Sequence, residues 1–314
     1  MRTSGSVRLG IIDVGTNALH LHIGDRAPDG RFRLLLQRRE LPRLGGGGLV
    51  RGRLTTAAMA RAMAVLRRYA VLLQRHRVEH VEAVATSAAR EAANGAAFVR
   101  RVRRALDLPL RIISGRDEAR LIFLGVLFVH RLRRPTAIVS IGGGSTQVMH
   151  GDARGPRYLV SVPLGGARLA QRFIRHDPPL PGELVAMAAC VRRVWAPVVR
   201  ALRRHRWTQA WGSSSTIDQL SLVAWLQTHR RPPSARQTRW LTQAALRRVL
   251  RQAAAVTAAQ RRRLPGVDPR REDMVVPTGI VLLAWMEACG IARLRFAPGS
   301  LREGLVWEAR RAAA

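Results

Sequence analysis

Two stretches of the chain share one pattern of apolar and polar positions. Residues 137–151, AIVSIGGGSTQVMHG, pass from an apolar run into three glycines and two hydroxyl residues and then alternate. Residues 9–22, LGIIDVGTNALHLH, pass from an apolar run into an Asp-x-Gly-Thr-Asn segment and alternate again. Each pattern predicts a strand, a tight turn and a second strand. Because one copy heads each half of the chain, we expect two related domains that face one anion across a cleft.

The remaining periodicities alternate between strands and helices. The first half predicts a strand over 33–41, a helix capped by Thr55 and Thr56 that ends near 76, a strand over 81–85, and a short strand that turns into a helix over 112–129. The second half predicts a strand over 158–163, helical structure over 165–205, a strand that opens a helix over 208–217, a polar loop over 227–239, and mostly helices up to 288. A strand at 294–297 and a terminal helix after Gly299 complete an α/β pattern.

The length of 314 residues fits two domains better than one. The polar segment RLRRPT around Pro135 is the predicted crossover. We therefore expect an N-terminal α/β domain over residues 1–132 and a C-terminal α/β domain over 133–314, whose last helix could pack back on the first domain.

The turn after the strand at 137–141 has the chemistry of a phosphate site. Three consecutive glycines, Gly142, Gly143 and Gly144, allow backbone N–H groups to converge without interference from a Cβ atom. Ser145 and Thr146 add hydroxyl donors. A further Gly/Ser-rich turn over 212–215 opens a helix and is another place where N–H groups could meet an anion.

Polar residues also follow the predicted strand at 81–85. Thr86, Ser87 and Arg90 lie where an open α/β sheet usually binds its ligand. Arg90 is a candidate to bind phosphate with two parallel hydrogen bonds. The alternative is an ordinary surface arginine in an arginine-rich chain.

The carboxylates at the start of the helix near 115 have different predicted tasks. Ser114 and Asp117 have capping-box spacing, so Asp117 is expected to cap the helix. Glu118 is then available to accept a proton from water. The alternative is an ion pair between Glu118 and an arginine such as Arg120 or Arg90.

The charge balance is strongly basic. The chain has 54 Lys and Arg residues, none of them Lys, against 20 Asp and Glu, a formal charge of +34. Such a surplus attracts polyanions in a salt-dependent way. Aromatic residues are only 5%, and no zinc-ligand spacing or aromatic stacking motif accompanies the arginines, so a specific nucleic-acid binder is not expected.

Two further features bear on location. No apolar run is long enough to cross a bilayer, which predicts a cytoplasmic protein without a membrane partner. Cys190 and Cys289 form no spacing motif and are expected to be buried thiols.

These ordered motifs resemble the exopolyphosphatase and guanosine pentaphosphate phosphohydrolase (Ppx/GppA) family. The resemblance spans nearly the whole chain, at the length of the short, two-domain members. It rests on the segments IIDVGTNALHLHI, RLGGGGLVRGRLT, ATSAARE, IISGRDEARLIFLGV, IVSIGGGSTQ, SVPLGGARL and APGSLREGLVWE.

The resemblance implies the fold of actin, the sugar kinases and the heat-shock chaperone ATPases, with two ribonuclease H-like domains. It implies hydrolysis of the terminal phosphoanhydride of inorganic polyphosphate or guanosine pentaphosphate, usually with Mg²⁺, and makes a homodimer plausible. Glu118 matches the family's general base. Its phosphate-binding positions are matched by Asp13, Thr16, Asn17 and Arg90 in the first domain and by Gly142, Gly143, Gly144, Ser145 and Thr146 in the second, with Asp13 also a candidate metal ligand.

The chain departs from the family pattern at two acids. The family usually has Asp at the position of Ser140 and Glu at the position of Gln147. Ser140 is expected to weaken Mg²⁺ binding, and Gln147 can position a water but cannot take its proton. Two functions therefore stay open: an exopolyphosphatase with reduced turnover, or a catalytically weak sensor that binds polyphosphate or the alarmone.

Overall fold

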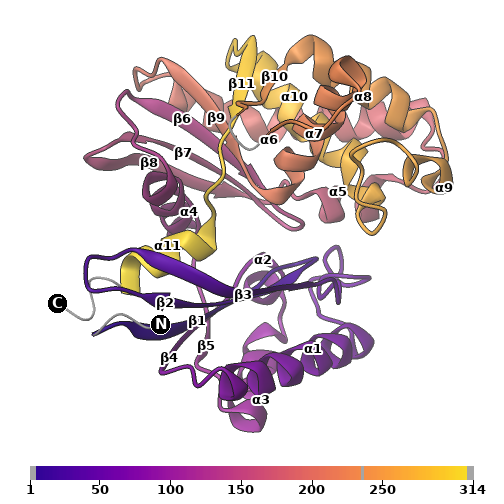
Figure 1. Ribbon diagram of the computed structural model, residues 1–314. Helices are drawn as coiled ribbons and strands as arrows, with labels where there is room; N and C mark the ends of the chain where they lie inside the picture. Colours follow the sequence, from indigo (N-terminus) through magenta and orange to yellow (C-terminus); the bar gives the residue numbers. More distant parts are fainter. Residues whose placement is uncertain (1–4, 235–236, 310–314) are drawn as a thin grey trace. The chain divides into compact units, whose positions relative to one another are not determined.

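The computed structural model describes residues 5–234 and 237–309, which divide into two compact units. Unit 1 holds the described residues up to Val129 together with those from Gly299 onward, and unit 2 is His130–Pro298 (Figure 1). The chain thus leaves unit 1 after Val129 and returns to it after Pro298. The sequence-based division at 132/133 lies close to the first of these crossings.

Unit 1 is built on a five-stranded mixed sheet of order β3-β2-β1-β4-β5. The strands β1 (Val7–Val14), β2 (Leu19–Arg26) and β3 (Phe32–Glu40) form an antiparallel meander, and β4 (His80–Ala85) and β5 (Leu110–Ile112) continue the sheet in parallel with β1. Its helices are α1 (Thr56–Arg75), α2 (Ser87–Glu91), α3 (Gly95–Leu106), α4 (Gly115–Val129) and α11 (Leu301–Ala309). The Thr55 side chain caps α1 by accepting from the Ala58 N–H, as predicted.

Unit 2 repeats this strand order with one addition. The meander β6 (Thr136–Ile141), β7 (Thr146–Asp152) and β8 (Gly155–Val162) is followed by β9 (Gln209–Ser213) and β11 (Arg293–Phe296), both parallel to β6, and by the antiparallel edge strand β10 (Trp240–Thr242). Its helices are α5 (Gly166–Phe173), α6 (Pro181–Leu202), α7 (Ser215–His229), α8 (Gln243–Ala254), α9 (Ala258–Arg261) and α10 (Val275–Ala288), with a 3₁₀ turn at Glu272–Met274. Two units with the same order confirm the predicted fold class.

Two element predictions are wrong. The helical stretch expected over 165–205 is two helices, because Pro178, Pro179 and Pro181 cannot donate backbone hydrogen bonds to a continuing helix. The segment from 239 begins with a short strand instead of a helix, because Trp240 and Leu241 pair with β11 at the sheet edge.

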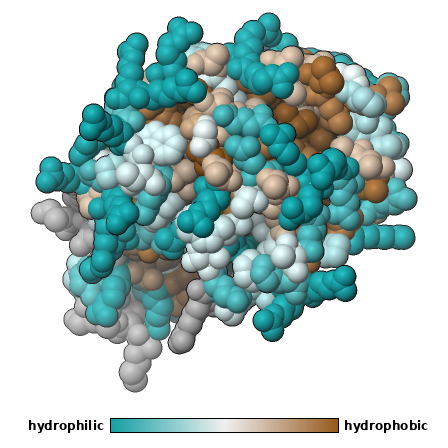
Figure 2. Space-filling view, turned by 90° about the horizontal axis from the view of Figure 1, so that it is seen from above, coloured by the Kyte–Doolittle hydropathy of each residue, from teal (hydrophilic) through white to brown (hydrophobic). Residues whose placement is uncertain are grey.

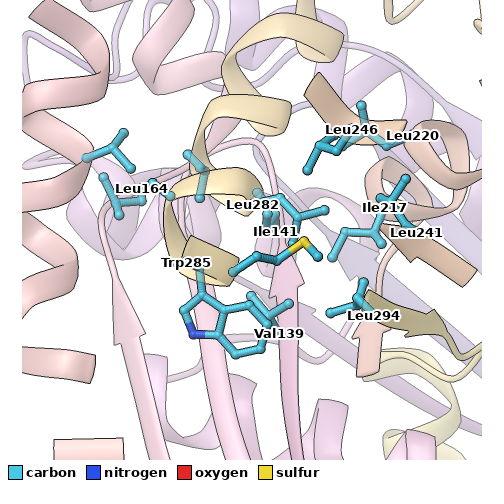
Figure 3. Close-up of a cluster of buried hydrophobic side chains, with 14 of the residues drawn as sticks. Val139, Ile141, Leu164, Ile217, Leu220, Leu241, Leu246, Leu282, Trp285 and Leu294 are labelled. Carbon is cyan, nitrogen blue, oxygen red and sulfur yellow. The ribbon is translucent and has the colours of Figure 1, made fainter. Parts of the chain in front are cut away.

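The core of unit 2 lies between its sheet and the helices that pack on it. Figure 3 shows side chains from β6, β11, α7, α8 and α10 converging there, with Trp285 beside Val139. The Trp195 indole, from α6, donates to the Val281 carbonyl at 3.0 Å. Helix α10 is buried among the other elements of the unit, and this accounts for its apolar sequence.

The return of the chain to unit 1 depends on close backbone packing. Helix α11 packs on α4 and contacts β1. A Cβ atom on Gly304 would lie 1.9 Å from the Leu121 carbonyl oxygen, and one on Gly125 would lie 1.9 Å from the Ser300 carbonyl oxygen. Only glycine allows the two helices to approach this closely.

The surface reflects the charge of the chain. Figure 2 shows extended hydrophilic side chains spread over the face seen from above, with smaller hydrophobic areas between them.

No helix in the described part of the chain has both the length and the apolar character that crossing a bilayer requires.

Candidate functional site

The turn between β1 and β2 forms one part of the candidate site in unit 1. The Gly15 N–H donates to the Ala18 carbonyl at 3.0 Å and closes the turn. The glycine-rich connector packs against it, since the Gly45 N–H donates to Thr16 O at 2.9 Å and the Arg43 N–H donates to Asn17 O at 3.0 Å. The backbone of Thr16 and Asn17 is thus fixed from outside the turn.

The Asn17 side chain is buried without a complete set of partners. The residue is 9% exposed, and its amide nitrogen has no hydrogen-bond partner in the described part of the protein. A buried N–H group without a partner costs free energy, and such groups in native proteins call for an explanation. The Asn17 amide nitrogen is thus a buried donor at the end of β1 that could donate to a ligand.

Asp13 lies one residue before the end of β1. Burial raises the pKa of its carboxyl to about 6, while the nearby Arg302 guanidinium lowers it. Arg302 comes from α11, and its Nη1 atom lies 3.8 Å from Asp13 Oδ2. Sequence reasoning missed Arg302, which lies 289 positions further along the chain and is brought here only by the return of α11.

Glu118 is held in the first turn of α4. Ser114 and Asp117 form the predicted cap, with the Asp117 N–H donating to Ser114 Oγ at 3.0 Å. Glu118 is 8% exposed, and Arg90 Nη1 donates to its Oε2 atom at 2.9 Å. Arg90 is therefore the ion-pair partner of Glu118, whereas the other arginine considered, Arg120, pairs with Glu308.

This environment adjusts the proton affinity of Glu118. Burial raises the pKa of the carboxyl to about 7, the Arg90 charge and hydrogen bond lower it, and the negative charges of Asp13 and Glu91 raise it further. Arg90 also donates to the Ile113 carbonyl at 3.2 Å, which fixes its guanidinium at the carboxyl end of the sheet. A carboxylate with a pKa near neutrality is suited to proton transfer at neutral pH.

The glycine turn between β6 and β7 has its carbonyl oxygens bound on one side. The Gly166 N–H donates to Gly142 O at 3.0 Å, the Arg168 N–H donates to Gly143 O at 3.1 Å, and Arg168 Nε donates to Gly144 O at 2.8 Å. In a trans peptide the N–H points opposite to the C=O. The N–H groups of Gly143, Gly144 and Ser145 therefore point away from α5, as an anion cradle requires.

The approach of α5 to this turn requires a glycine. A Cβ atom on Gly165 would lie 2.3 Å from Gly143 O and from Gly144 N. These are backbone atoms, so the clash could not be relieved by a side-chain movement. Gly165 thus allows α5 to approach the glycine turn, and the sequence marks this position only by its Gly-Gly pair.

The comparisons with known proteins identify the family of the chain. The model of the Ppx/GppA phosphatase family matches residues 25–311. The chain belongs to the Ppx/GppA phosphatase family. Exopolyphosphatase 1 of Mycobacterium bovis and that of Mycobacterium tuberculosis are each 28% identical to it over 302 residues, covering 96% of this chain and 87% of theirs.

Solved structures of the Ppx/GppA family are also similar. An exopolyphosphatase from Cytophaga hutchinsonii is 31% identical with a TM-score of 0.89, covering 97% of this chain and 98% of that one. The Aquifex aeolicus family member is 25% identical with a TM-score of 0.79, covering 98% and 99%. The whole two-unit chain, and not a single motif, therefore matches the family.

The two hydroxyl groups beside the glycine turn differ in their hydrogen bonds. The Thr146 hydroxyl donates to the Leu164 carbonyl, whereas the Ser145 hydroxyl accepts a hydrogen bond and keeps its own proton to donate. Gln147 is 2% exposed, and its amide nitrogen donates to Ser145 Oγ at 2.9 Å and to Ser161 Oγ at 3.1 Å. The Thr146 hydroxyl therefore has an internal hydrogen bond, and the Gln147 amide links β7 to Ser161 on β8.

A row of neutral side chains crosses the sheet of unit 2 where the family pattern has acids. Ser140 pairs with Gln147 on β7 and with Ser213 on β9, and Gln147 pairs with Ser161 on β8. Directly paired residues share a face of the sheet. Ser161 and Ser213 therefore lie on the same face of the sheet as Ser140 and Gln147. The sequence alone does not reveal this register.

The turn after β9 is contacted by a distant arginine that the sequence did not indicate. Ser214 caps α7 by accepting from the Ile217 N–H at 3.3 Å, and the buried Arg271 guanidinium donates to Ser215 Oγ at 2.9 Å and to Thr216 Oγ1 at 2.7 Å. Arg271 braces this turn through side-chain contacts. In a chain with so many arginines, no signal in the sequence distinguishes it.

The donor set bears on the Mg²⁺ that the Ppx/GppA resemblance implies. Within the described residues, no group of three or more His, Cys, Asp or Glu side chains could hold a metal ion. Mg²⁺ is usually held by one or two carboxylates together with substrate phosphates. Asp13 fits the role of a single protein ligand for an Mg²⁺ ion that the phosphate substrate carries, while the neutral row through Ser140 and Gln147 offers no carboxylate.

Proposed function

We propose that the protein releases the terminal phosphate of inorganic polyphosphate by hydrolysis. The observation that carries this proposal is Glu118, a buried carboxylate in contact with Arg90 whose pKa is raised to about 7. Membership of the Ppx/GppA phosphatase family and similarity to proteins named exopolyphosphatase support the choice of substrate.

In the proposed reaction Glu118 accepts a proton from a water molecule as the water oxygen attacks the terminal phosphorus. The new P–O bond forms as the bond to the bridging oxygen breaks, and the shortened polymer leaves as the anion. Arg90 orients the Glu118 carboxylate through its 2.9 Å hydrogen bond. Asp13 is the proposed contact to the Mg²⁺ that the polyphosphate carries.

The proposed phosphate contacts are hydrogen-bond donors that have no partner among the described residues. In unit 1 these are the Asn17 amide nitrogen and the backbone N–H groups of Thr16 and Asn17, and in unit 2 the N–H groups of Gly143, Gly144 and Ser145. Such preorganised donors stabilise charge without the cost of reorienting in the reaction. Arg90 supplies positive charge on the unit 1 side.

A second candidate function is supported by the neutral row in unit 2. Ser140 and Gln147 stand where the family pattern has acids, and the amide nitrogen of Gln147 donates to Ser145 and Ser161. Loss of a metal-supporting group commonly lowers activity by about 10 to 100-fold. We therefore propose, as the alternative, a slow enzyme that works mainly as a sensor of polyphosphate or guanosine pentaphosphate.

Phosphate release distinguishes these functions. The purified protein would be incubated with polyphosphate, and separately with guanosine pentaphosphate, with Mg²⁺ and with chelator. Repeated turnover of polyphosphate supports the enzyme, and binding with less than one phosphate released per protein supports the sensor. Binding of neither compound would contradict both.

A further inference from the structure

An arginine-lined groove runs along the C-terminal half of α6 in unit 2. It has a volume of about 640 Å³ and is lined by Arg192, Ala196, Val199, Arg200, Arg203, Arg204 and Ala288. Ala288 ends α10, which packs beside α6. The Arg203 guanidinium donates to the Ala288 carbonyl at 2.8 Å and ties the two helices together at the groove.

The groove has no compensating negative charge. The sequence from 184 to 217 contains no Asp or Glu but six arginines. Arg192, Arg200, Arg203 and Arg204 are exposed, and none forms an ion pair with a residue that the structure describes. Neighbouring helices differ in this respect, since Arg247 on α8 pairs with Glu287 and Arg262 after α9 pairs with Glu272.

The spacing of the arginines suits an extended anion. Arg192, Ala196 and Arg200 are four residues apart and share one face of α6, and Arg204 follows in the turn directly after the helix ends at Leu202. From Arg192 to the end of α6 at Leu202 the helix advances by ten residues, which is about 15 Å at 1.5 Å per residue, and Arg203 and Arg204 lie just beyond this end. Positive charge repeated over this length matches a polymer with repeated charges better than a single phosphate.

The residues at the floor of the groove favour polyphosphate over single-stranded nucleic acid as the ligand. It is formed by Ala196, Val199 and Ala288, and no aromatic residue lines it. Single-stranded nucleic acid usually binds where aromatic side chains stack on its bases. Small apolar residues between guanidinium groups offer contacts for phosphates and none for bases.

We infer that this groove binds the chain of inorganic polyphosphate, as a contact additional to the candidate catalytic residues. The inference rests on the proposed function for its choice of ligand. A second contact on one polymer acts through effective concentration, so it strengthens binding of chains long enough to reach both contacts. The groove therefore selects long polyphosphate over triphosphate.

Binding of a fluorescent polyphosphate tests the inference. The ligand would be a long-chain polyphosphate, with unlabelled triphosphate as competitor, and every protein would carry Glu118→Gln so that the ligand is not consumed. The test variant is Arg192→Gln, Arg200→Gln and Arg204→Gln. The matched control is Arg100→Gln, Arg101→Gln and Arg104→Gln on α3, which removes the same charge from exposed residues that do not line the groove.

We expect the groove variant to lose about tenfold in affinity for long polyphosphate and to show a shallower salt dependence, because fewer counterions are released. Triphosphate affinity stays unchanged, and the α3 control binds long chains as the parent does. Equal weakening by both triple variants, or no weakening by the groove variant, would overturn the inference. So would single-stranded DNA that competes for the groove as well as polyphosphate of equal charge.

This outcome is independent of catalysis. Phosphate release is measured separately with the Glu118-containing protein, so an inactive protein that still binds long chains through the groove would contradict the proposed hydrolysis and leave the groove assignment standing.

Discussion

Glu118 combines burial with a single strong contact to Arg90, and this combination predicts its pH behaviour. Since the pKa is raised to about 7, the proton-accepting form increases as pH rises through neutrality. We expect the turnover number for polyphosphate to rise with an apparent pKa near 7. A profile of rate against pH measures this limb, and a rate that is flat from pH 5 to 8 would contradict the assigned role.

The same shift has a consequence for stability. A carboxyl group whose pKa is higher in the folded state than its ordinary value favours folding while it is protonated, and this contribution is lost as pH rises from about 4.5 to about 7. The burial of Asp13 acts in the same direction. In Glu118→Gln the free energy of unfolding should therefore fall less between pH 5 and pH 8 than in the wild type.

Asn17 provides a test of ligand contact at one residue. Its amide nitrogen has no hydrogen-bond partner among the residues that the structure describes, so Asn17→Ala should cost less free energy of unfolding than a substitution that breaks an internal hydrogen bond. Loss of a hydrogen bond to a charged ligand should cost about 1.5–3 kcal/mol of polyphosphate affinity. Chemical denaturation and ligand titration measure the two effects.

The other asparagine is the matched control. Asn94 donates to Leu54 O at 2.9 Å and accepts from the Leu54 N–H at 2.8 Å, so Asn94→Ala should lose stability and leave the affinity of the folded protein intact. If Asn17→Ala lost stability and kept its affinity, the assignment of Asn17 to the phosphate side would be refuted.

Residue-level prediction from the sequence succeeded where the partners are local. Ser114 and Asp117 are three positions apart, so their cap follows from spacing alone. Arg90 and Glu118 are 28 positions apart, and their contact was only one of two alternatives. The free nitrogen of Asn17 depends on the packing of the whole turn and could not be predicted.

At the scale of elements, the contact between the glycine turn and α5 is the most sensitive to substitution. Gly165→Ala places a Cβ atom against the backbone of Gly143 and Gly144, so we expect a loss of about 1–3 kcal/mol in the free energy of unfolding. Phosphate binding should weaken as well. Gly182→Ala is the control, because nothing lies within 4 Å of its Cβ position in α6.

Thermal unfolding of the two variants gives the comparison. A Gly165→Ala protein as stable and as tightly binding as Gly182→Ala would show that α5 does not shape the turn.

The neutral row across β6 and β7 predicts a gain of function. The Ser145 and Ser161 hydroxyls that accept from Gln147 can instead donate to a carboxylate, so Gln147→Glu can be accommodated. Together with Ser140→Asp it supplies the oxygen ligands that Mg²⁺ prefers. We expect the double variant to hydrolyse polyphosphate about 10 to 100-fold faster than the wild type with Mg²⁺ and to bind it more weakly in chelator.

The single variants complete this experiment as a double-mutant cycle. If the gains of the two single variants in activation free energy simply add, the two acids do not act together. A folded double variant as slow as the wild type at saturating Mg²⁺ would mean that the missing acids do not limit the rate.

The elements themselves were mostly predictable because their patterns are local. Alternation fixed the two hairpins, and Thr55 marked the start of α1. The division of α5 from α6 was not predicted, because the apolar period alone does not show where the prolines at 178, 179 and 181 interrupt the helix. Strand β10 was missed because only its pairing with β11, more than 50 residues later, makes it a strand.

For the whole molecule, the repeated strand order explains why the sequence indicated two related units. Each unit begins with an antiparallel meander whose first turn carries candidate phosphate contacts, and this repetition is visible in the two similar sequence patterns. The return of α11 to unit 1 was foreseen only as a possibility. Its contribution to the site, Arg302 beside Asp13, depends on contacts between distant parts of the chain.

The role of Glu118 as the proton acceptor in polyphosphate hydrolysis is tested directly by one comparison. Phosphate release by the wild type and by Glu118→Gln would be measured at saturating polyphosphate, with affinity measured in parallel. Glutamine keeps an oxygen that can accept from Arg90 but is not a base, so we predict a rate at least about 10²-fold lower with affinity near that of the wild type. An unchanged rate, or a loss of rate matched by an equal loss of affinity, would contradict the central claim.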